Sequence, residues 1–278
     1  MPNYIQNRLE LVGTSEQVKE VLKRFSTHYK KTPSTSYDCN LIFENKSTKE
    51  YGWFNKKTKE FTTRDKPPTY KIPKGFEQKF DNAWTRFPDF NKIIPRPKEL
   101  DISSDTFVSP MENSKFGGQT KLREHLDSIR QYISKCPNPD ARKETIDNFI
   151  AGVKNYLKHG HSTWYSWSIE NWGVKWNCSE CKKIDKSLFE FTTAWSGVPE
   201  LIKKMSGEFP GVKFVYEFSD EDTGSNCGAG TFYGGEAFFK MLDNQSIEAY
   251  ELAFKLRPDR AENYKLVNGK YKYIEESE

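Results

Sequence analysis

One segment in the second half of the chain restricts the fold most, because a strand, a helix and a second strand follow one another directly. The strands are predicted at Leu188–Trp195 and Val212–Phe218, and the helix at Val198–Glu208. Pro199 suits the first turn of this helix, and the Pro210–Gly211 pair ends it. Such a unit fits one half of a split βαβ arrangement.

The start of the chain fits the other half. Tyr4–Val12 alternates apolar and polar side chains, as a strand does, and Gly13 ends the pattern. Thr14 or Ser15 can cap a helix whose apolar residues recur at helical spacing, namely Val18, Val21, Leu22 and Phe25. Strands and helices then alternate irregularly, which favours an α+β fold over a doubly wound parallel sheet.

Two segments are predicted to be insertions into one elaborated domain, residues 1–278. Residues 40–64 are expected to form a β-hairpin or meander, with strands at Leu41–Glu44, Tyr51–Phe54 and Glu60–Thr63. Residues 119–158 are expected to form a helical hairpin, with helices at 119–134 and 140–158. The remaining predictions are a strand at Phe90–Ile94, a strand in the glycine-rich residues 225–235, a helix at Ser246–Lys255 and a terminal hairpin turning at Asn268–Gly269.

Several stretches together resemble a known family. MPNYIQNRLELVG, FNKIIPRPKEL, NWGVKWN and FEFTTAWSGVPELIKKMSGEFPGVKFVYEFSDE are similar, in this order, to the YubB ferredoxin-like domain of phage and plasmid proteins. The resemblance implies a ferredoxin-like (split βαβ) antiparallel sheet and an origin on a mobile element, most simply a phage. It implies no catalytic residues, because the family has no agreed ones.

Composition bears on the compartment. The chain has 278 residues, a mean hydropathy of −0.84 and no run of 18 apolar residues, so no membrane span is expected. The first residues lack the basic start and apolar core of a secretory signal. Five cysteines are too few and too scattered for a disulfide framework. We expect a protein of the host cell cytoplasm.

The charge is distributed unevenly along the chain. Residues 1–100 contain 20 Lys and Arg against 12 Asp and Glu, whereas the rest of the chain has a small acidic excess. A basic N-terminal lobe can attract phosphates or nucleic acid, with Trp53, Phe54, Lys56, Lys57 and Lys59 as the contact surface. The alternative is an ordinary solvated face, since the lysines are mixed with glutamates.

The richest cluster of aromatic and polar residues is WYSWSIENWGVKWN, residues 164–177. Rings beside amides and guanidinium groups can stack on a base and bond its edge. The candidate ligand-binding residues are Asn171, Trp172, Lys175, Trp176, Trp195, Trp84, Arg86 and Arg8. The alternative is that the tryptophans pack helices onto the sheet, which we expect of Trp164 and Trp167.

Catalytic motifs are missing from the sequence. There is no GxSxG elbow, phosphate loop, GxGxxG or HExxH pattern, so we predict no catalytic residues and no cofactor. Cys178 and Cys181 form a CxxC, with His159 and His161 upstream. These four residues are suggestive of zinc, but the histidine spacing is unusual and no second CxxC exists. We predict no metal site and leave zinc as the alternative.

These observations favour a binding protein over an enzyme. We expect a phage accessory protein that sequesters a nucleotide-derived small molecule, such as an immune signal made by the host. The first alternative is a nucleic-acid-binding or anti-restriction protein that uses the basic lobe, and the second is a nucleotide-processing enzyme. The expected partners are a nucleotide-like small molecule, a nucleic acid or a host defence protein, with no membrane. We also expect a homo-oligomer.

Overall fold

The alternating segment at the N-terminus forms a nine-residue strand, β1 (Tyr4–Val12), in the computed structural model, as predicted. The structure describes residues 3–35, 40–64, 66–104 and 118–274. Two compact units divide the chain: residues 1–26 with 87–278, called the framework unit, and Thr27–Arg86, called the insert unit. No helix in the described ranges is both long enough and apolar enough to cross a membrane.

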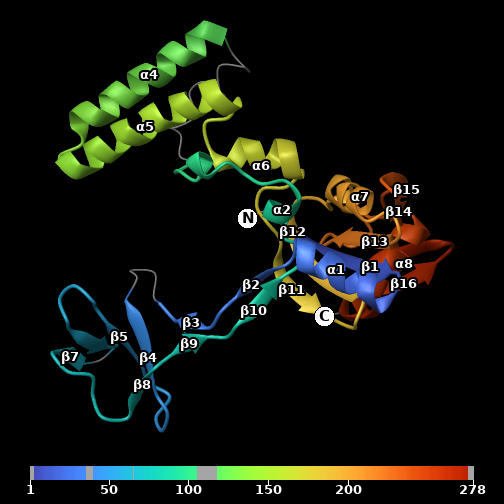
Figure 1. Cartoon of the computed structure of the whole chain (residues 1–278), viewed down its shortest axis with the longest axis horizontal. Helices are drawn as coiled ribbons and strands as arrows, with labels where there is room; N and C mark the ends of the chain where they lie inside the picture. The colour runs from blue at the N-terminus through green and yellow to red at the C-terminus, as the bar shows by residue number, and fades with distance from the viewer. Residues whose placement is uncertain (1–2, 36–39, 65, 105–117, 275–278) are drawn as a thin grey trace. The chain divides into compact units, whose positions relative to one another are not determined.

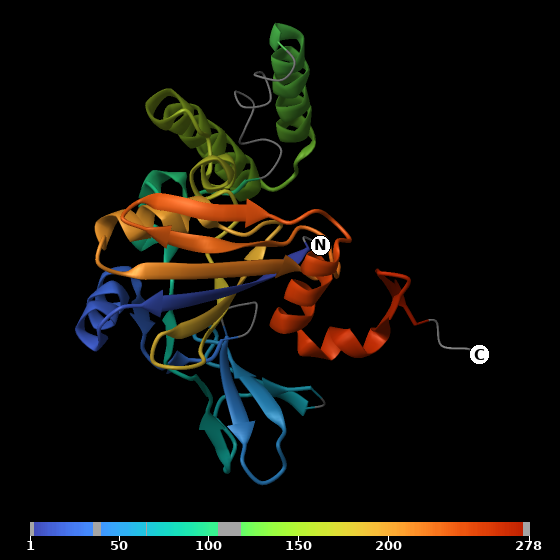
Figure 2. The ribbon, with the colours of Figure 1, turned by 90° about the vertical axis from the view of Figure 1, so that its right-hand side faces the viewer.

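The framework unit contains the split βαβ arrangement. Strands β12 (Leu188–Ala194) and β13 (Lys213–Asp220) both pair antiparallel with β1, one on each side, and α7 (Pro199–Glu208) connects them. The full sheet has the order β11-β12-β1-β13-β14-β15 (Figures 1 and 2). Its other strands are β11 (Ser179–Lys183), β14 (Gly228–Tyr233) and β15 (Glu236–Met241). The predicted ferredoxin-like α+β fold is confirmed.

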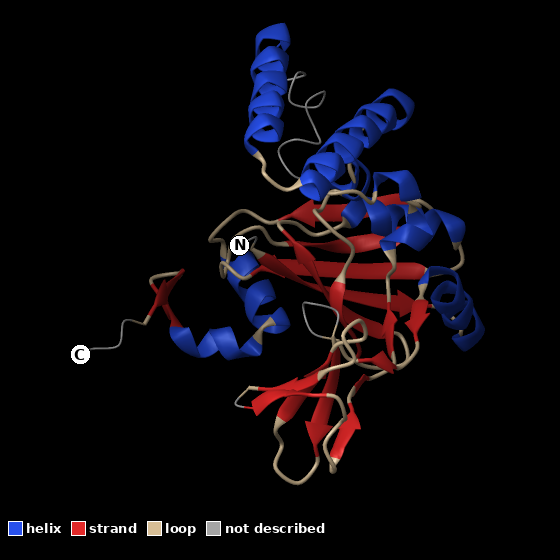
Figure 3. Cartoon of the chain, turned by 90° about the vertical axis from the view of Figure 1, so that its left-hand side faces the viewer, coloured by secondary structure: helices blue, strands red, loops and turns tan. Residues whose placement is uncertain are grey.

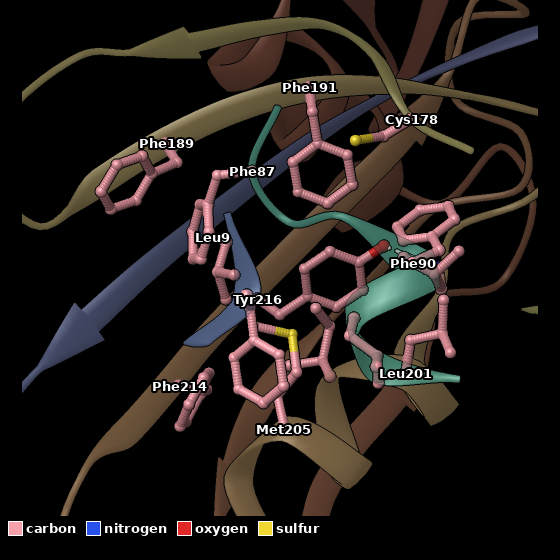
Figure 4. Close-up of a cluster of buried hydrophobic side chains, with 14 of the residues drawn as sticks. Leu9, Phe87, Phe90, Cys178, Phe189, Phe191, Leu201, Met205, Phe214 and Tyr216 are labelled. Carbon is pink, nitrogen blue, oxygen red and sulfur yellow. Dashed lines mark hydrogen bonds between the residues drawn. The ribbon is translucent and has the colours of Figure 1, made fainter. Parts of the chain in front are cut away.

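Helices α1 and α7 bury their apolar faces in one core. Helix α1 (Ser15–Phe25) begins with a capping box between Thr14 and Gln17, and it buries Val18, Val21 and Phe25. The core then continues through rings and aliphatic side chains of the central strands and α7, including Leu9, Phe191, Leu201, Phe214 and Tyr216 (Figure 4). Burying one such large side chain contributes roughly 1.5–3 kcal/mol, so these residues hold the sheet and helices together.

A buried polar network lies inside this core. The Tyr216 hydroxyl donates to Asn7 Oδ1 at 2.5 Å and accepts from the Val198 backbone N–H at 2.7 Å. The Asn7 amide nitrogen donates to Thr193 Oγ1 and to the carbonyls of Ile5 and Phe191. The network therefore ties β1, β12, β13 and the start of α7 together.

Two local predictions differ from the structure. Phe90–Ile94 was predicted as a strand, but Phe90–Ile93 is a helical turn, α2, followed by η1 (Lys98–Leu100). The strand prediction is wrong because Asp89 acts as an N-cap, accepting from Asn91 N at 3.0 Å. The aromatic stretch contains a helix that was not predicted, α6 (Trp164–Trp172), capped by Thr163.

The two helices predicted at 119–134 and 140–158 are present as α4 (Gly118–Lys135) and α5 (Pro139–His159), close to the predicted limits. Asn138 caps α5, and Gly160 ends it with a φ of 74°. Helix α5 is anchored to η1, because the Asn155 side chain donates to the Glu99 carbonyl at 2.8 Å. Lys158 pairs with the Glu99 carboxylate at 2.6 Å, and this contact lowers the pKa of Glu99.

The end of the framework unit follows the prediction. Helix α8 (Ile247–Leu256) begins after its cap, Ser246, and η2 (Pro258–Asn263) follows. The terminal hairpin joins β16 (Tyr264–Val267) to β17 (Lys270–Tyr273). It turns at Asn268 and Gly269, which have φ values of 51° and 74°, as a two-residue hairpin loop requires.

The insert unit is larger than the predicted insertion 40–64. The expected strands are present as β4 (Leu41–Asn45), β5 (Tyr51–Phe54) and β6 (Phe61–Thr63). With β7 (Lys66–Thr69) and β8 (Phe76–Gln78) they form a sheet of order β7-β6-β5-β4-β8. Two small ribbons pair β2 (Thr27–Tyr29) with β10 (Trp84–Arg86) and β3 (Thr32–Pro33) with β9 (Phe80–Asp81). Figure 3 shows that the described part of this unit contains strands and loops.

Candidate functional site

A pocket opens on the sheet of the insert unit. Its volume is about 580 Å³. Its lining combines two rings, three cations, two carboxylates and three smaller side chains: Tyr51, Trp53, Lys49, Arg64, Lys79, Glu50, Asp81, Ser34, Thr35 and Ile42. Its volume lies in the range of small-molecule sites, and its lining is more polar than is usual for them. We call it the insert pocket.

Strand register explains why the pocket lies on this face of the sheet. Phe43 pairs with Gly52, and Phe54 pairs with Phe61, so these residues share one face. Phe43 and Phe61 are buried there, and the Phe61 ring lies where a side chain on Gly52 would be. Ile42 and Trp53 are also directly paired, on the opposite face, and both line the pocket. The alternation of side chains along the strands thus places the phenylalanine core on one face of the sheet and the insert pocket on the other.

Hydrogen bonds order part of the pocket wall. The Lys79 ammonium donates to the Tyr51 hydroxyl at 3.0 Å and lies 4.5 Å from the centre of that ring. The bond to Tyr51 raises the pKa of Lys79, so the amine is charged at neutral pH. On β9, Asp81 accepts from the Ser34 hydroxyl at 2.7 Å. The pocket wall therefore presents the Lys79 ammonium beside the Tyr51 ring. It also presents the Asp81 carboxylate, which can accept further hydrogen bonds.

Two of the predicted ligand-binding residues, Trp84 and Arg86, belong to a separate stack in the same unit. The Trp84 and Tyr29 rings are parallel to within 8°, with centroids 4.2 Å apart. The Arg86 guanidinium lies 5.0 Å from the Trp84 centroid and donates to the Tyr29 hydroxyl at 2.8 Å. Trp84 remains 43% exposed, although Tyr29 stacks on its ring and Arg86 lies over it.

Three other predicted residues meet in the framework unit. The Lys175 ammonium lies 4.6 Å from the Trp176 ring, 5.7 Å from Trp195 and 5.8 Å from Tyr165. We call these four residues the Lys175 cluster. Tyr165 and Trp195 are more than a third exposed. Ring faces at these distances attract a cation, so the cluster already holds its own positive charge.

Trp195 takes an uncommon backbone conformation, with a φ of 72°. Such a conformation costs about 1–3 kcal/mol in a residue other than glycine. It is held by two hydrogen bonds, from Trp195 N to the Asn3 carbonyl at 2.9 Å and from Asn226 Nδ2 to the Trp195 carbonyl at 3.0 Å. These contacts point to a fixed ring at the end of β12.

The structure corrects the prediction for Trp172. This ring is only 2% exposed, and its indole N–H donates to the Ile94 carbonyl at 3.0 Å. The prediction of a ligand-facing edge is wrong because Trp172, at the end of α6, packs edge-to-face against the rings of Phe90 and Trp167. Asn171 bonds back to the Trp167 carbonyl at the end of the same helix. Trp167 packs in the core as expected.

Arg8 does not join any of these groups. Its guanidinium pairs with Glu190 across β1 and β12, with two contacts of 2.8 and 3.1 Å to one oxygen. Seven of the eight predicted residues are therefore divided between the Lys175 cluster, the Trp84 stack, the core and a sheet ion pair, and Asn171 bonds within α6. The insert pocket was missed, because Lys79 follows β8 and Asp81 lies in β9, and neither strand was predicted. The one sequence feature that pointed to this pocket was Trp53 in a lysine-rich hairpin.

The four residues considered for zinc do not form a ligand set. Cys178 and Cys181 have their sulfurs 3.3 Å apart. His161 contacts Ser166 and Glu170, whereas His159 faces Glu99. In the described ranges no group of three or more His, Cys, Asp or Glu residues is arranged to hold a metal ion.

The comparison with family models finds one match. A family described as "Ferredoxin-like domain in Api92-like protein" matches residues 171–256. No curated protein and no solved structure matches the chain. The matched range contains β11 to β15 with α7 and α8, and includes Lys175, Trp176 and Trp195. It supplies two sheet partners of β1, and the chain thus contains a ferredoxin-like domain.

Proposed function

We propose that this chain is a binding protein that takes up a nucleotide-derived small molecule in the insert pocket. The observation that carries the proposal is the pairing of two rings, one exposed (Tyr51) and one half-buried (Trp53), with cations in one concavity of about 580 Å³. Tyr51 and Trp53 offer faces for stacking of a base, worth about 1–3 kcal/mol per base. Lys49, Arg64 and Lys79 match the charge of a phosphate group.

The acidic residues of the pocket add selectivity. Glu50 and Asp81 accept hydrogen bonds and cannot donate them when ionised, so they favour the amino and ring N–H groups of a base. A pocket lined by cations alone would take any polyanion. The mixture of signs supports a ligand with both an aromatic donor edge and an anionic group, as nucleotides have.

The biological setting belongs to the same proposal. The likeness to the YubB domain of phage and plasmid proteins supports an accessory protein from a mobile element that works in the host cytoplasm. Sequestration of a host immune signal requires binding without turnover, and we propose binding of this kind, by a homo-oligomer. A hydrolysed or transferred ligand would instead identify a nucleotide-processing enzyme.

The experiment is a calorimetric titration with a panel of ribonucleoside phosphates and cyclic nucleotides. Arg64→Gln should weaken the best ligand about tenfold or more, because a charged hydrogen bond contributes about 1.5–3 kcal/mol. Lys57→Gln is the matched control: Lys57 is an exposed cation of the same unit, outside the pocket lining, and its loss should change affinity little. Equal losses in both variants, or no binding by the panel, would refute the proposal.

The same samples show whether the ligand has been chemically changed. The complex is denatured after incubation, and the mass of the released ligand is measured by mass spectrometry. An intact ligand supports sequestration, and a shortened one supports the enzymatic alternative.

A second candidate function is binding of single-stranded nucleic acid by the same unit. It is favoured by charge, because Thr27–Arg86 contains 13 Lys and Arg against 7 Asp and Glu, while the rest of the chain has 30 against 32. The Trp84 ring, stacked on Tyr29, would then contact the base that follows the one held in the insert pocket. An oligonucleotide bound in this way should lose affinity steeply as salt rises, whereas a mononucleotide stacked in a pocket should not.

A further inference from the structure

The two thiols of the CxxC segment meet at an irregular point of the sheet edge. Cys178 Sγ and Cys181 Sγ are 3.3 Å apart. In a regular strand, residues i and i+3 point to opposite faces, so their sulfurs could not meet. Here the register between β11 and β12 shifts between Ser179 and Lys182, and Glu180 has a φ of 48°. The local backbone is thus distorted in a way that brings the thiols together.

We propose that Cys178 and Cys181 form a thiol–disulfide exchange site that reacts with low-molecular-weight disulfides and closes reversibly to an intramolecular disulfide. A disulfide needs sulfurs at about 2.05 Å, so the pair has to close by roughly 1.3 Å, which a small side-chain rotation can supply. The described part of the chain contains two other cysteines, Cys136 and Cys227, which are also thiols.

The surroundings of the two sulfurs set the order of reaction. Cys181 is partly exposed, whereas Cys178 is 1% exposed and lies beside the Phe191 ring (Figure 4). Cys181 therefore reacts first: its thiolate attacks one sulfur of a disulfide RSSR, forms Cys181–S–SR and releases RS⁻. Cys178 then attacks Cys181 Sγ and releases the second RS⁻. The two protons lost by the protein thiols leave as two RSH, so RSSR is reduced and the dithiol oxidised.

Closure of the pair has a defined structural consequence. The Cys178 thiol donates to the Pro88 carbonyl at 2.8 Å, and a disulfide sulfur has no proton to donate. The neighbouring Asn177 bonds the same segment, accepting from Phe90 N at 3.0 Å and donating to Asp89 at 2.7 Å. Oxidation removes the hydrogen bond from Cys178 to the Pro88 carbonyl. The backbone amides at the start of α2 should therefore exchange their hydrogens faster.

The test uses the full chain and oxidised glutathione as the probe. Wild-type protein is incubated with the probe, remaining thiols are alkylated, and peptides are weighed. The expected product is a closed disulfide within residues 178–181, two mass units lighter than the dithiol. In Cys178→Ala the second step is blocked, so a glutathione adduct should accumulate on Cys181. In Cys181→Ser neither product should form at this segment.

Three results would overturn the proposal. One is full alkylation of both thiols after wild-type protein has reached equilibrium in oxidised glutathione. Another is a stable glutathione adduct on Cys181 in wild-type protein, since Cys178 would then be unable to resolve it. The third is unchanged amide exchange at residues 89–91 after closure. Cys136→Ser is the matched control, because that thiol has no CxxC partner and its removal should leave closure intact.

Discussion

At the scale of single residues, the buried Tyr216 hydroxyl links β1 to the start of α7. It donates a hydrogen bond to Asn7 Oδ1 and accepts one from the Val198 backbone N–H. Tyr216→Phe leaves both groups buried and unsatisfied, so it should lower the free energy of unfolding by about 1–3 kcal/mol. Urea unfolding measures this value. Tyr233→Phe is the control, because Tyr233 is half exposed and should change stability little; equal effects of the two substitutions would contradict the role of the network.

A second residue-scale prediction concerns Cys227, where burial raises the pKa of the thiol from 9.0 to about 11. Below pH 9 the thiol is protonated in both the folded and the unfolded chain. Between pH 9 and 11 the unfolded chain ionises it first, so unfolding releases a proton and stability falls as pH rises. Urea unfolding of wild-type protein and Cys227→Ala should therefore converge over this range. A difference independent of pH would show that Cys227 does not contribute this dependence.

The aromatic residues show how far sequence reasoning reaches at this scale. Trp195 and Trp172 were both predicted to bind a ligand, and the first is 38% exposed whereas the second is buried. Both lie beside polar residues, and local composition cannot distinguish them. The difference arises from the packing of Trp172 against Phe90 and Trp167, and from the positive φ that holds Trp195 at a strand end. Neither is encoded by hydrophobic periodicity alone.

At the scale of elements, a buried amide anchors α5 to η1 beside the Lys158–Glu99 ion pair. Asn155 is 6% exposed, and its side chain donates to the carbonyls of Glu99 and Ser162. Asn155→Ala leaves these carbonyls without that donor and should release the C-terminal half of α5 from η1. Hydrogen exchange should become faster in residues 98–101 and 150–162 while the central sheet stays protected. Lys154→Ala, on an exposed position one residue earlier, should change neither region.

Elements with a strong hydrophobic pattern were predictable, whereas the short helix α2, which depends on its cap alone, was not. β1, β12, α7 and β13 follow from alternation, helical spacing and proline positions, and the structure contains them nearly as predicted. Phe90–Ile93 reads as a strand by composition, yet the Asp89 side chain starts a helix there. The short ribbons of the insert unit have two or three residues each. These short strands form because they pair with strands distant in the sequence, and the local sequence pattern does not predict them.

At the scale of the whole molecule, the insert unit leaves and re-enters the framework unit at two neighbouring points. Asp89 N donates to the Phe25 carbonyl at 2.8 Å, and Thr27 pairs with Arg86 as the first rung of the β2–β10 ribbon. The chain ends created by removing residues 27–86 would thus lie close together. A short Gly-Ser linker from Ser26 to Phe87 should close the gap at a small entropic cost.

This geometry leads to a prediction that separates the two proposed sites. The linked deletion protein should fold, because the core of β1, α1, α7, β12 and β13 is complete without the insert unit. It should lose binding of nucleotides, since every residue that lines the insert pocket has been removed. It should still close the Cys178–Cys181 disulfide, whose surroundings lie in the framework unit. Circular dichroism, calorimetry and peptide mass analysis measure the three properties on one sample. Nucleotide binding retained by a folded deletion protein would move the site to the framework unit, with the Lys175 cluster as its first candidate.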